Sequence, residues 1–343
     1  MIQAAQNSWK IIAPVNQLAE VEILATAGVD EIYCGILPDD WISKYGDWDT
    51  LNRRQGQGAN LASANDLSAL AQAANEHGIP AALALNVRYT SSQLTRVIEY
   101  AKIWDQSGGA AIIVSDLGLL NALRQSDLHV KLHLSLLAGV FNSRAAKFYQ
   151  QFGVSRIILP RSLSIAEMKE ITAGCQGLDF EAMVLNDKCQ FIDAYCGFYH
   201  GKCYPPGIGS YFHYAQSPEG DWETFSHDLH YAGHACQLPF TTDQGLAPSM
   251  CKDDFNCPHC AACYLNDLSN AGVACFKLGG RGFPTEFKLQ GISYIRECIS
   301  FNKSEIESQT EALYDAYHRK CIESYKKHYG AFCSPDRCYY NRD

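Results

Sequence analysis

Long apolar runs are missing from this 343-residue sequence, and no stretch approaches the roughly 20 apolar residues of a membrane span. The N-terminus, MIQAAQNSWKIIAPV, has polar residues where a signal peptide would have an apolar run. Long basic runs are missing too, and a net charge of -9 argues against broad nucleic-acid binding, although a local basic patch could serve one RNA. We therefore expect a cytoplasmic protein without a membrane segment.

Cysteine is the residue present in excess. Eight of the fifteen cysteines lie between residues 189 and 263, and in a reducing compartment such richness is more natural for metal or cluster ligation than for disulfides. Cys257, Cys260 and Cys263 form a Cys-x2-Cys-x2-Cys run, the strongest single motif, while six residues separate Cys189 from Cys196. Short spacings let one loop supply several of the four thiolates that a cubane iron-sulfur cluster needs.

Two alternatives to a cluster stay open at this point. The first is a structural zinc ion, which gains from the spacing of His227, His230 and His234 beside Cys236. The second is a set of buried, unreactive thiols, which the Pro-His and Ala-Ala pairs within the Cys-x2-Cys-x2-Cys run make less natural.

The first 185 residues alternate short apolar runs with amphipathic helical patterns, the rhythm of β-α units around a parallel sheet. Helices are expected between the strands, for example over 65–77 with Asn65 as N-cap and over 164–172 with Ser164 as N-cap. The expected strands are Ile11–Val15, Glu31–Ile36, Ala81–Asn86, Ala110–Ser115, Val130–Leu136, Arg156–Pro160, Phe180–Leu185 and, after the cysteine region, Val273–Leu278. This pattern predicts a (β/α)8 TIM-like barrel, with an open doubly wound sheet as the alternative.

The domain organisation follows from the same pattern. Residues 1–300 are expected to form the barrel domain, with a Cys-rich, cluster-binding insertion over 186–265 between the seventh and eighth strands. Residues 301–343 are expected to form a C-terminal extension, a half-exposed helix followed by a short end rich in cysteine and tyrosine.

Polar residues gather where the expected strands end, which is where active sites of such barrels lie. They are Asn86, Asp116, His133 with Ser135, Arg161 and the loop after Leu185, which carries Cys189. Each of three has a structural alternative: Asp116 as a helix cap, His133 as a hydrogen-bonded core residue and Arg161 as a surface ion-pair residue.

Several segments, in the right order, resemble a known family. They are KIIAPVNQLAEVEILATAGVDEIYCG at the start, Arg54 and Asn60, LALNV at 83–87, AAIIVSDLGLL at 110–120, HLSLLAGVFNS at 133–143 and GVSRIILPRSLSIAEMKEI at 153–171. On these residues the chain resembles the collagenase-like peptidases of family U32 over roughly 10–290.

The resemblance implies a 4Fe-4S cluster held by Cys189, Cys196, Cys236 and Cys260. It also implies a part in oxygen-independent hydroxylation of RNA bases or of the ubiquinone ring, in some members with prephenate as the hydroxyl source. A cluster-bearing partner subunit that works with a second U32-type chain is an alternative. The peptidase label is a weaker one, since neither Gly-x-Ser-x-Gly nor His-Glu-x-x-His occurs.

This chain departs from the family pattern near the expected pocket. Leu185 and Asn186 stand where the family typically has His-Gly, and Leu278 to Arg281 read Leu-Gly-Gly-Arg in place of Ile-Glu-Gly-Arg. Leu136 and Leu137 replace a usual Thr-Gln pair. A lost histidine and a lost acid would alter proton handling and polar recognition, so the substrate stays open.

Roles follow for the remaining polar residues. His133 and Glu181 are the expected proton-transfer groups, and an anionic substrate would be held by Arg54, Asn86, Arg161 and Arg281. Four cysteines in apolar contexts are expected in the core: Cys34, Cys175, Cys275 and Cys298. Seven surplus cysteines could hold a second metal: Cys203, Cys251, Cys257, Cys263, Cys321, Cys333 and Cys338.

Overall fold

The computed structural model describes residues 9–46, 49–54, 57–189, 191–196, 258–303 and 311–340, with four short strand segments between 215 and 247. Eight strands form the central barrel, and every one overlaps a strand expected from the sequence: β1 (Lys10–Pro14), β2 (Glu31–Cys34), β3 (Ala81–Leu85), β4 (Ala111–Val114), β5 (Lys131–Leu134), β6 (Val154–Ile158), β7 (Asp179–Leu185) and β12 (Cys275–Leu278).

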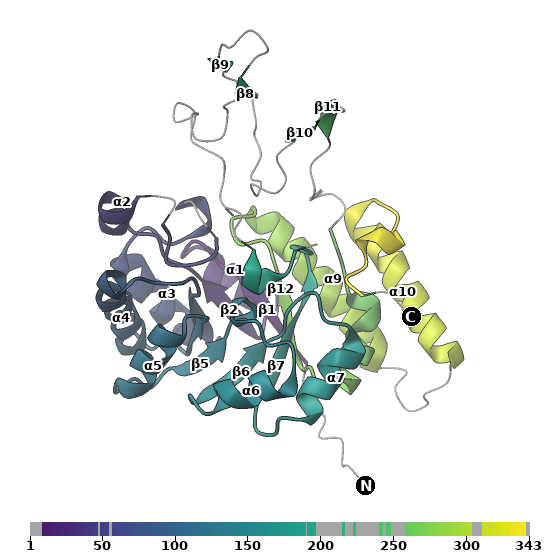
Figure 1. Ribbon diagram of the computed structural model, residues 1–343. Coiled ribbons are helices and arrows are strands. Elements are labelled where there is room, and N and C mark those ends of the chain that lie inside the picture. Colours follow the sequence, from purple (N-terminus) through teal and green to yellow (C-terminus); the bar gives the residue numbers. More distant parts are fainter. Residues whose placement is uncertain are drawn as a thin grey trace.

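The barrel is closed and all of its strand pairs are parallel (Figure 1). Around the barrel the strand order is β1-β12-β7-β6-β5-β4-β3-β2, so β12 closes the sheet between β7 and β1. The (β/α)8 prediction is confirmed, and the open doubly wound sheet is excluded.

Helices surround the barrel in Figure 1. Their bounds are α1 (Glu20–Thr26), α2 (Asp39–Tyr45), α3 (Ala64–Glu76), α4 (Ser91–Gln106), α5 (Leu117–Gln125), α6 (Ser143–Gln150), α7 (Ile165–Ala173), α8 (Leu265–Asn270), α9 (Thr285–Lys303) and α10 (Glu311–Tyr329). The described residues also contain short 3-10 turns: η1 (Gln57–Ala59), η2 (Leu136–Ala138), η3 (Asp193–Tyr195), η5 (Ala262–Tyr264) and η6 (Pro335–Arg337). None of the described helices is long and apolar enough to cross a membrane.

Two small antiparallel sheets lie in the sequence between β7 and β12. They pair β8 (Ala215–Gln216) with β9 (Trp222–Glu223), and β10 (Phe240–Thr242) with β11 (Gly245–Ala247). The long insertion between the seventh and eighth barrel strands is therefore present.

Side-chain caps fix where several helices begin. Ser164 caps α7 in a reciprocal capping box with Glu167, as predicted. The cap predicted at Asn65 is wrong, because α3 begins at Ala64 and the Ser63 hydroxyl accepts the Asp66 N–H. Asp116 caps α5 by accepting the Leu119 N–H at 2.7 Å, which confirms its structural alternative.

The barrel interior is lined by small and medium-sized residues on one side, notably Ala82, Ala84 and Ala111 on β3 and β4. These short side chains leave volume inside the barrel, and long charged side chains from the other strands lie there. The outer faces of the strands pack against the helices in the main apolar core. All four cysteines expected in the core are buried, which confirms that prediction: Cys34, Cys175, Cys275 and Cys298.

The C-terminal part folds back onto the barrel. Figure 1 shows α10, in yellow, beside α9. After α10 the chain returns to the end of β7, where Cys260 forms isolated bridges to both Leu185 and Cys338. The division predicted at residue 300 falls inside α9, and that division stays a prediction.

Candidate functional site

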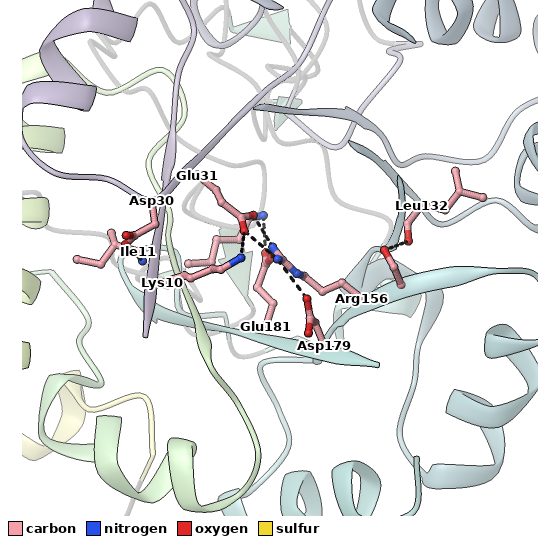
Figure 2. Close-up of polar contacts among 10 residues, drawn as sticks. Lys10, Ile11, Asp30, Glu31, Leu132, Arg156, Asp179 and Glu181 are labelled. Atoms are coloured by element: carbon pink, nitrogen blue, oxygen red, sulfur yellow. Dashed lines mark hydrogen bonds and ion pairs between the residues drawn. The ribbon is translucent and has the colours of Figure 1, made fainter. Parts of the chain in front are cut away.

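A chain of buried ion pairs runs through the barrel (Figure 2). Arg156 on β6 binds Glu31 on β2 through two contacts, Nη1–Oε2 at 2.6 Å and Nη2–Oε1 at 2.9 Å. The same Nη1 lies 3.2 Å from Oε2 of Glu181 on β7, whose other oxygen accepts from Lys277 Nζ at 2.7 Å. Lys10 completes the chain with a 2.9 Å contact to Glu31.

The cations of this network keep both of its carboxylic acids, Glu31 and Glu181, ionised. Burial raises the pKa of Glu181, but Lys277 and Arg156 outweigh that effect and leave the pKa lowered. The pKa of Glu31 is lowered to about 2, because Arg156 and Lys10 together outweigh its burial. Glu181 was predicted to transfer protons; it is ionised here with both oxygens engaged, and its role stays a prediction.

His133 on β5 is also buried in the barrel, at 5% exposure. Burial and the nearby Arg156 charge lower its pKa to about 4, so the imidazole is neutral near pH 7. Its register partners are Ile113 on β4 and Arg156 on β6, which places it inside the same charged layer as Glu181. The structure thus brings together the two residues predicted to transfer protons.

The loop after β7 has an unusual backbone. Asn186 and Asp187 adopt left-handed φ values of 61° and 55°, a region that, apart from glycine, asparagine and aspartate enter most readily. The Asp187 carboxylate accepts the Gly280 N–H at 3.0 Å through Oδ2, and its Oδ1 lies 2.5 Å from Arg54 Nη2. Asp187 therefore links the ends of β7 and β12 to the loop after β2.

The four residues predicted to hold an anion lie at the carboxyl ends of the strands, with different partners. Arg54 pairs with Asp187, and Arg161 pairs with the buried Asp193. Asn86 accepts the Arg53 N–H and donates to Ser135 Oγ at 3.1 Å. Arg161 does form an ion pair, but the pair does not lie on the surface as the alternative predicted, because the Arg161 side chain is only 10% exposed.

Arg281 differs from the other arginines. It is 6% exposed and donates from Nη2 to Asn52 Oδ1, while its Nε and Nη1 are buried without a hydrogen-bond partner in the described structure. Burial lowers the pKa of Arg281 to about 10. A buried guanidinium with unmet donors is costly, which marks Arg281 as a group that an anion would stabilise.

Two of the predicted cluster ligands lie on the same loop. Cys189 and Cys196 are both half-buried, and the charge of Arg53 interacts with both thiols. Arg53 also donates from Nη2 to the Cys196 carbonyl at 3.0 Å, and the charge of Arg161 interacts with Cys189. Two cationic side chains therefore lie by the loop that carries both cysteines.

Cys260 is positioned differently. Its backbone bridges Leu185 at the end of β7, but its Sγ lies 3.3 Å from Tyr294 Oη and accepts the Ala262 N–H. Burial raises its pKa to about 12, with Cys263 adding to the effect. Within the described residues no three metal-binding side chains are grouped to hold an ion, and Cys236 lies outside them. The four-ligand set stays a prediction.

The surplus cysteines form contacts of their own. The thiol of Cys263 interacts with Cys321, and Cys321 with Cys298, in the apolar contact between η5, α9 and α10. Cys333 interacts with Cys338 in the C-terminal tail. Three surplus cysteines and three histidines of the zinc alternative lie outside the described residues: Cys203, Cys251, Cys257, His227, His230 and His234.

Sequence reasoning did not select several residues that carry the site. Arg53 and Asp187 had no signal other than their position after a strand. Three others did have one: Glu31, Arg156 and Lys277 are charged residues inside otherwise apolar strands, at positions that the barrel turns inward. Charged residues in buried strands are therefore the sign that the sequence offered.

Curated relatives share the chain's sequence at low identity. A collagenase of Porphyromonas gingivalis is 23% identical over 329 residues, 90% of this chain and 68% of that protein. The tRNA hydroxylation protein P2 of Bacillus subtilis is 24% identical, covering 73% of this chain and 78% of that protein. The tRNA hydroxylation protein P of Escherichia coli is 32% identical, but over 35% of this chain and only 25% of that protein.

Among solved structures, a dihydrodipicolinate synthetase-like protein of Pseudomonas aeruginosa covers 91% of this chain and 82% of its own, with a TM-score of 0.48 and 10% identity. A U32 peptidase structure covers 54% of this chain and 72% of its own, with a TM-score of 0.40 and 11% identity. The family model described as Peptidase family U32 matches residues 16–331. The chain belongs to peptidase family U32.

Proposed function

We propose that this protein takes part in the oxygen-independent hydroxylation of an RNA base, and that a 4Fe-4S cluster at the barrel mouth serves the reaction. The B. subtilis relative named as a tRNA hydroxylation protein matches along most of both chains. A quinone precursor or a related metabolite is the alternative substrate.

The gathering of arginines at the carboxyl ends of the strands carries the proposal. The chain has a net charge of -9, yet four arginines lie on loops at the carboxyl ends of the strands, around the loop after β7: Arg53, Arg54, Arg161 and Arg281. Such a local basic patch in an acidic protein suits one phosphate-bearing or carboxylate-bearing ligand rather than broad binding to nucleic acid.

The donor set is chemically suited to a cluster. Cys189 and Cys196 are soft thiol ligands beside two cations, on the loop that follows β7. The backbone of Cys260 pairs with Leu185 at the end of β7. We propose Cys189, Cys196, Cys236 and Cys260 as its holders, with zinc as the alternative metal. When bound, the cluster would supply electron transfer, or an open iron site, to the reaction.

The chain's own residues would position the substrate. Arg281 offers the unmet donors and would anchor an anionic group, while Arg54, Asn86 and Arg161 are each held by their own partners at the carboxyl ends of other strands. His133 is neutral near pH 7 and could accept a proton, whereas Glu181 holds Lys277 and Arg156 in place. Prephenate is the hydroxyl donor that we propose for this reaction.

The test compares metal content with tRNA modification. The protein is purified without oxygen, and tRNA is taken from cells that lack the gene and carry the wild type, Cys189→Ser, Cys196→Ser or the control Cys175→Ser. Cys175 is buried, with its Sγ 3.6 Å from the Ser143 carbonyl. We expect about four irons per wild-type chain. A nucleoside one oxygen heavier should depend on Cys189 and Cys196 but not on Cys175.

Other outcomes point elsewhere. A colourless protein that retains only zinc would reject the cluster, and unchanged nucleosides would reject RNA as substrate. A stable complex with a second U32-type chain that alone shows activity would make this protein the partner subunit. Because the collagenase relative spans 90% of this chain, denatured collagen is included as a substrate, and its cleavage by the Cys189→Ser variant would support a peptidase.

A further inference from the structure

Gly279, directly after β12, has no room for a side chain. A Cβ there would lie 2.3 Å from Oδ2 and 2.6 Å from Cγ of Asp187. The backbone of Gly279 does not need glycine, because its φ lies outside the left-handed region that penalises other residues. The carboxylate of Asp187 therefore occupies the space that a side chain at position 279 would fill.

Asp187 holds a backbone conformation that is uncommon outside glycine. Its φ of 55° lies in the left-handed region, which aspartate and asparagine tolerate better than other residues with a Cβ, and its side chain is only 11% exposed. Residues held in such a conformation persist when the surrounding structure requires them, and they cluster at functional sites. Here the surroundings are the Gly280 amide and the Arg54 guanidinium, both within hydrogen-bond distance of the carboxylate.

We propose that Asp187, at the end of β7, takes the place of the glutamate that the family resemblance puts at position 279, directly after β12. These strands are neighbours in the barrel, and Leu185 pairs with Leu278 just before the two residues. An acid on either strand end would thus reach the same volume. The position of the Asp187 carboxylate does not depend on which reaction the protein takes part in.

The carboxylate acts through Arg54. Its Oδ1 lies 2.5 Å from Arg54 Nη2, and the two side chains are 11% and 19% exposed, so the ion pair fixes the orientation of the guanidinium. Asp187 is therefore a positioning residue that holds the Arg54 guanidinium, charged, at the mouth. An anionic substrate group would meet Arg54 in this fixed orientation; this step rests on the proposed function.

The test removes the acidic side chain from position 187 and introduces one at position 279. The variants are Asp187→Gly, Gly279→Glu and the two combined, each with and without Arg54→Met, with Asp127→Gly on an exposed loop as the control. Gly279→Glu alone should lower the Tm by several degrees, because its Cβ collides with Asp187. The double variant should regain that loss, since Asp187→Gly removes the obstruction and glycine adopts a left-handed φ freely. Asp127→Gly should change the Tm by a degree or less.

The dependence on Arg54 decides the positioning role without any activity measurement. Arg54→Met should lower the Tm by several degrees in the wild type and in the double variant, where an acid is present, and by a degree or less in Asp187→Gly. An equal loss in all three backgrounds overturns the proposal, as does a double variant no more stable than Gly279→Glu.

Activity provides a second readout. In the hydroxylation assay Asp187→Gly should lose at least tenfold, and the double variant should recover most of that loss. Full activity of Asp187→Gly would overturn the positioning role. A wild type that hydroxylates nothing would reject the proposed function, while the Tm measurements would still decide where the acid belongs.

Discussion

Arg156 and Glu31 join opposite walls of the barrel. Their two contacts, at 2.6 and 2.9 Å, connect β6 with β2, which lie four places apart in the closed order of eight strands. The pair is an internal brace rather than a surface ion pair, because the side chains are 4% and 9% exposed. Glu181 and Lys277 extend the brace to β7 and β12.

Breaking this brace should strongly destabilise the fold. Arg156→Met leaves two buried carboxylates without a shared partner, and we expect the free energy of unfolding to fall by about 3–5 kcal/mol in urea titrations at pH 7. Arg96→Met is the matched control, since Arg96 and Asp40 form an exposed pair whose loss should cost less than about 1 kcal/mol. Equal effects of the two substitutions would contradict a bracing role.

Acidification should destabilise the protein through His133. The folded-state pKa is lowered to about 4, below the unfolded value of 6.5, so the unfolded chain takes the proton first as pH falls. The contribution of His133 is intact above pH 6.5 and is lost between pH 6.5 and 4, on the order of 3 kcal/mol in all. We expect His133→Gln to flatten the fall in urea stability between pH 6.5 and 4.5. Substitution of the exposed His129 by glutamine should leave it unchanged, and a His133→Gln curve as steep as the wild type would argue against this assignment.

Arg53 should influence metal retention. Its guanidinium lies beside Cys189 and Cys196 and binds the Cys196 carbonyl, so Arg53→Met removes both the charge and a tether of the loop. We expect the anaerobically purified variant to hold less than half of the wild-type iron after gel filtration. The exposed Arg96→Gln is the control, and an Arg53→Met protein with full iron content would separate Arg53 from the metal site.

The C-terminal tail should stabilise the end of β7. Tyr340 is buried, its ring packs edge-on against Tyr264, and its hydroxyl lies 3.5 Å from the Met183 carbonyl. Tyr340→Ala should therefore cost about 3–5 kcal/mol of unfolding free energy, and Tyr340→Phe about 1 kcal/mol or less. The same urea titrations provide the measurement. If Tyr340→Ala unfolded like the wild type, the packing of the tail would not stabilise the barrel.

The barrel could be predicted because its signals are local. Apolar runs of strand length alternate with capped amphipathic segments, and each boundary depends on a few neighbouring residues such as Ser164 and Glu167. The one wrong cap shows the limit of that reasoning. Asn65 and Ser63 are both good N-cap residues two positions apart, and only the backbone conformation of Ser63 decides between them.

The site was less predictable because its partners are distant in sequence. Arg54 was selected from the resemblance, but its pairing with Asp187 depends on how the loops after β2 and β7 meet. The residues around Asp187 in the sequence give no sign of its role. That role depends on Gly279, which follows the neighbouring strand β12 and leaves space for the aspartate side chain. The resemblance grouped Cys260 with Cys189, and that grouping stays a prediction, since the sulfur of Cys260 contacts Tyr294 through a fold that no local pattern specifies.

The bridges from Cys260 to Leu185 and Cys338 set the order in which the molecule can be completed during synthesis. The ribosome releases the chain from the N-terminus, so β7 emerges long before the tail that bonds to it through Tyr339 and the Asn186 carbonyl. Contacts that span such sequence distances form late and slowly. The end of β7 therefore stays partly uncovered until α10 and the residues after it have left the ribosome.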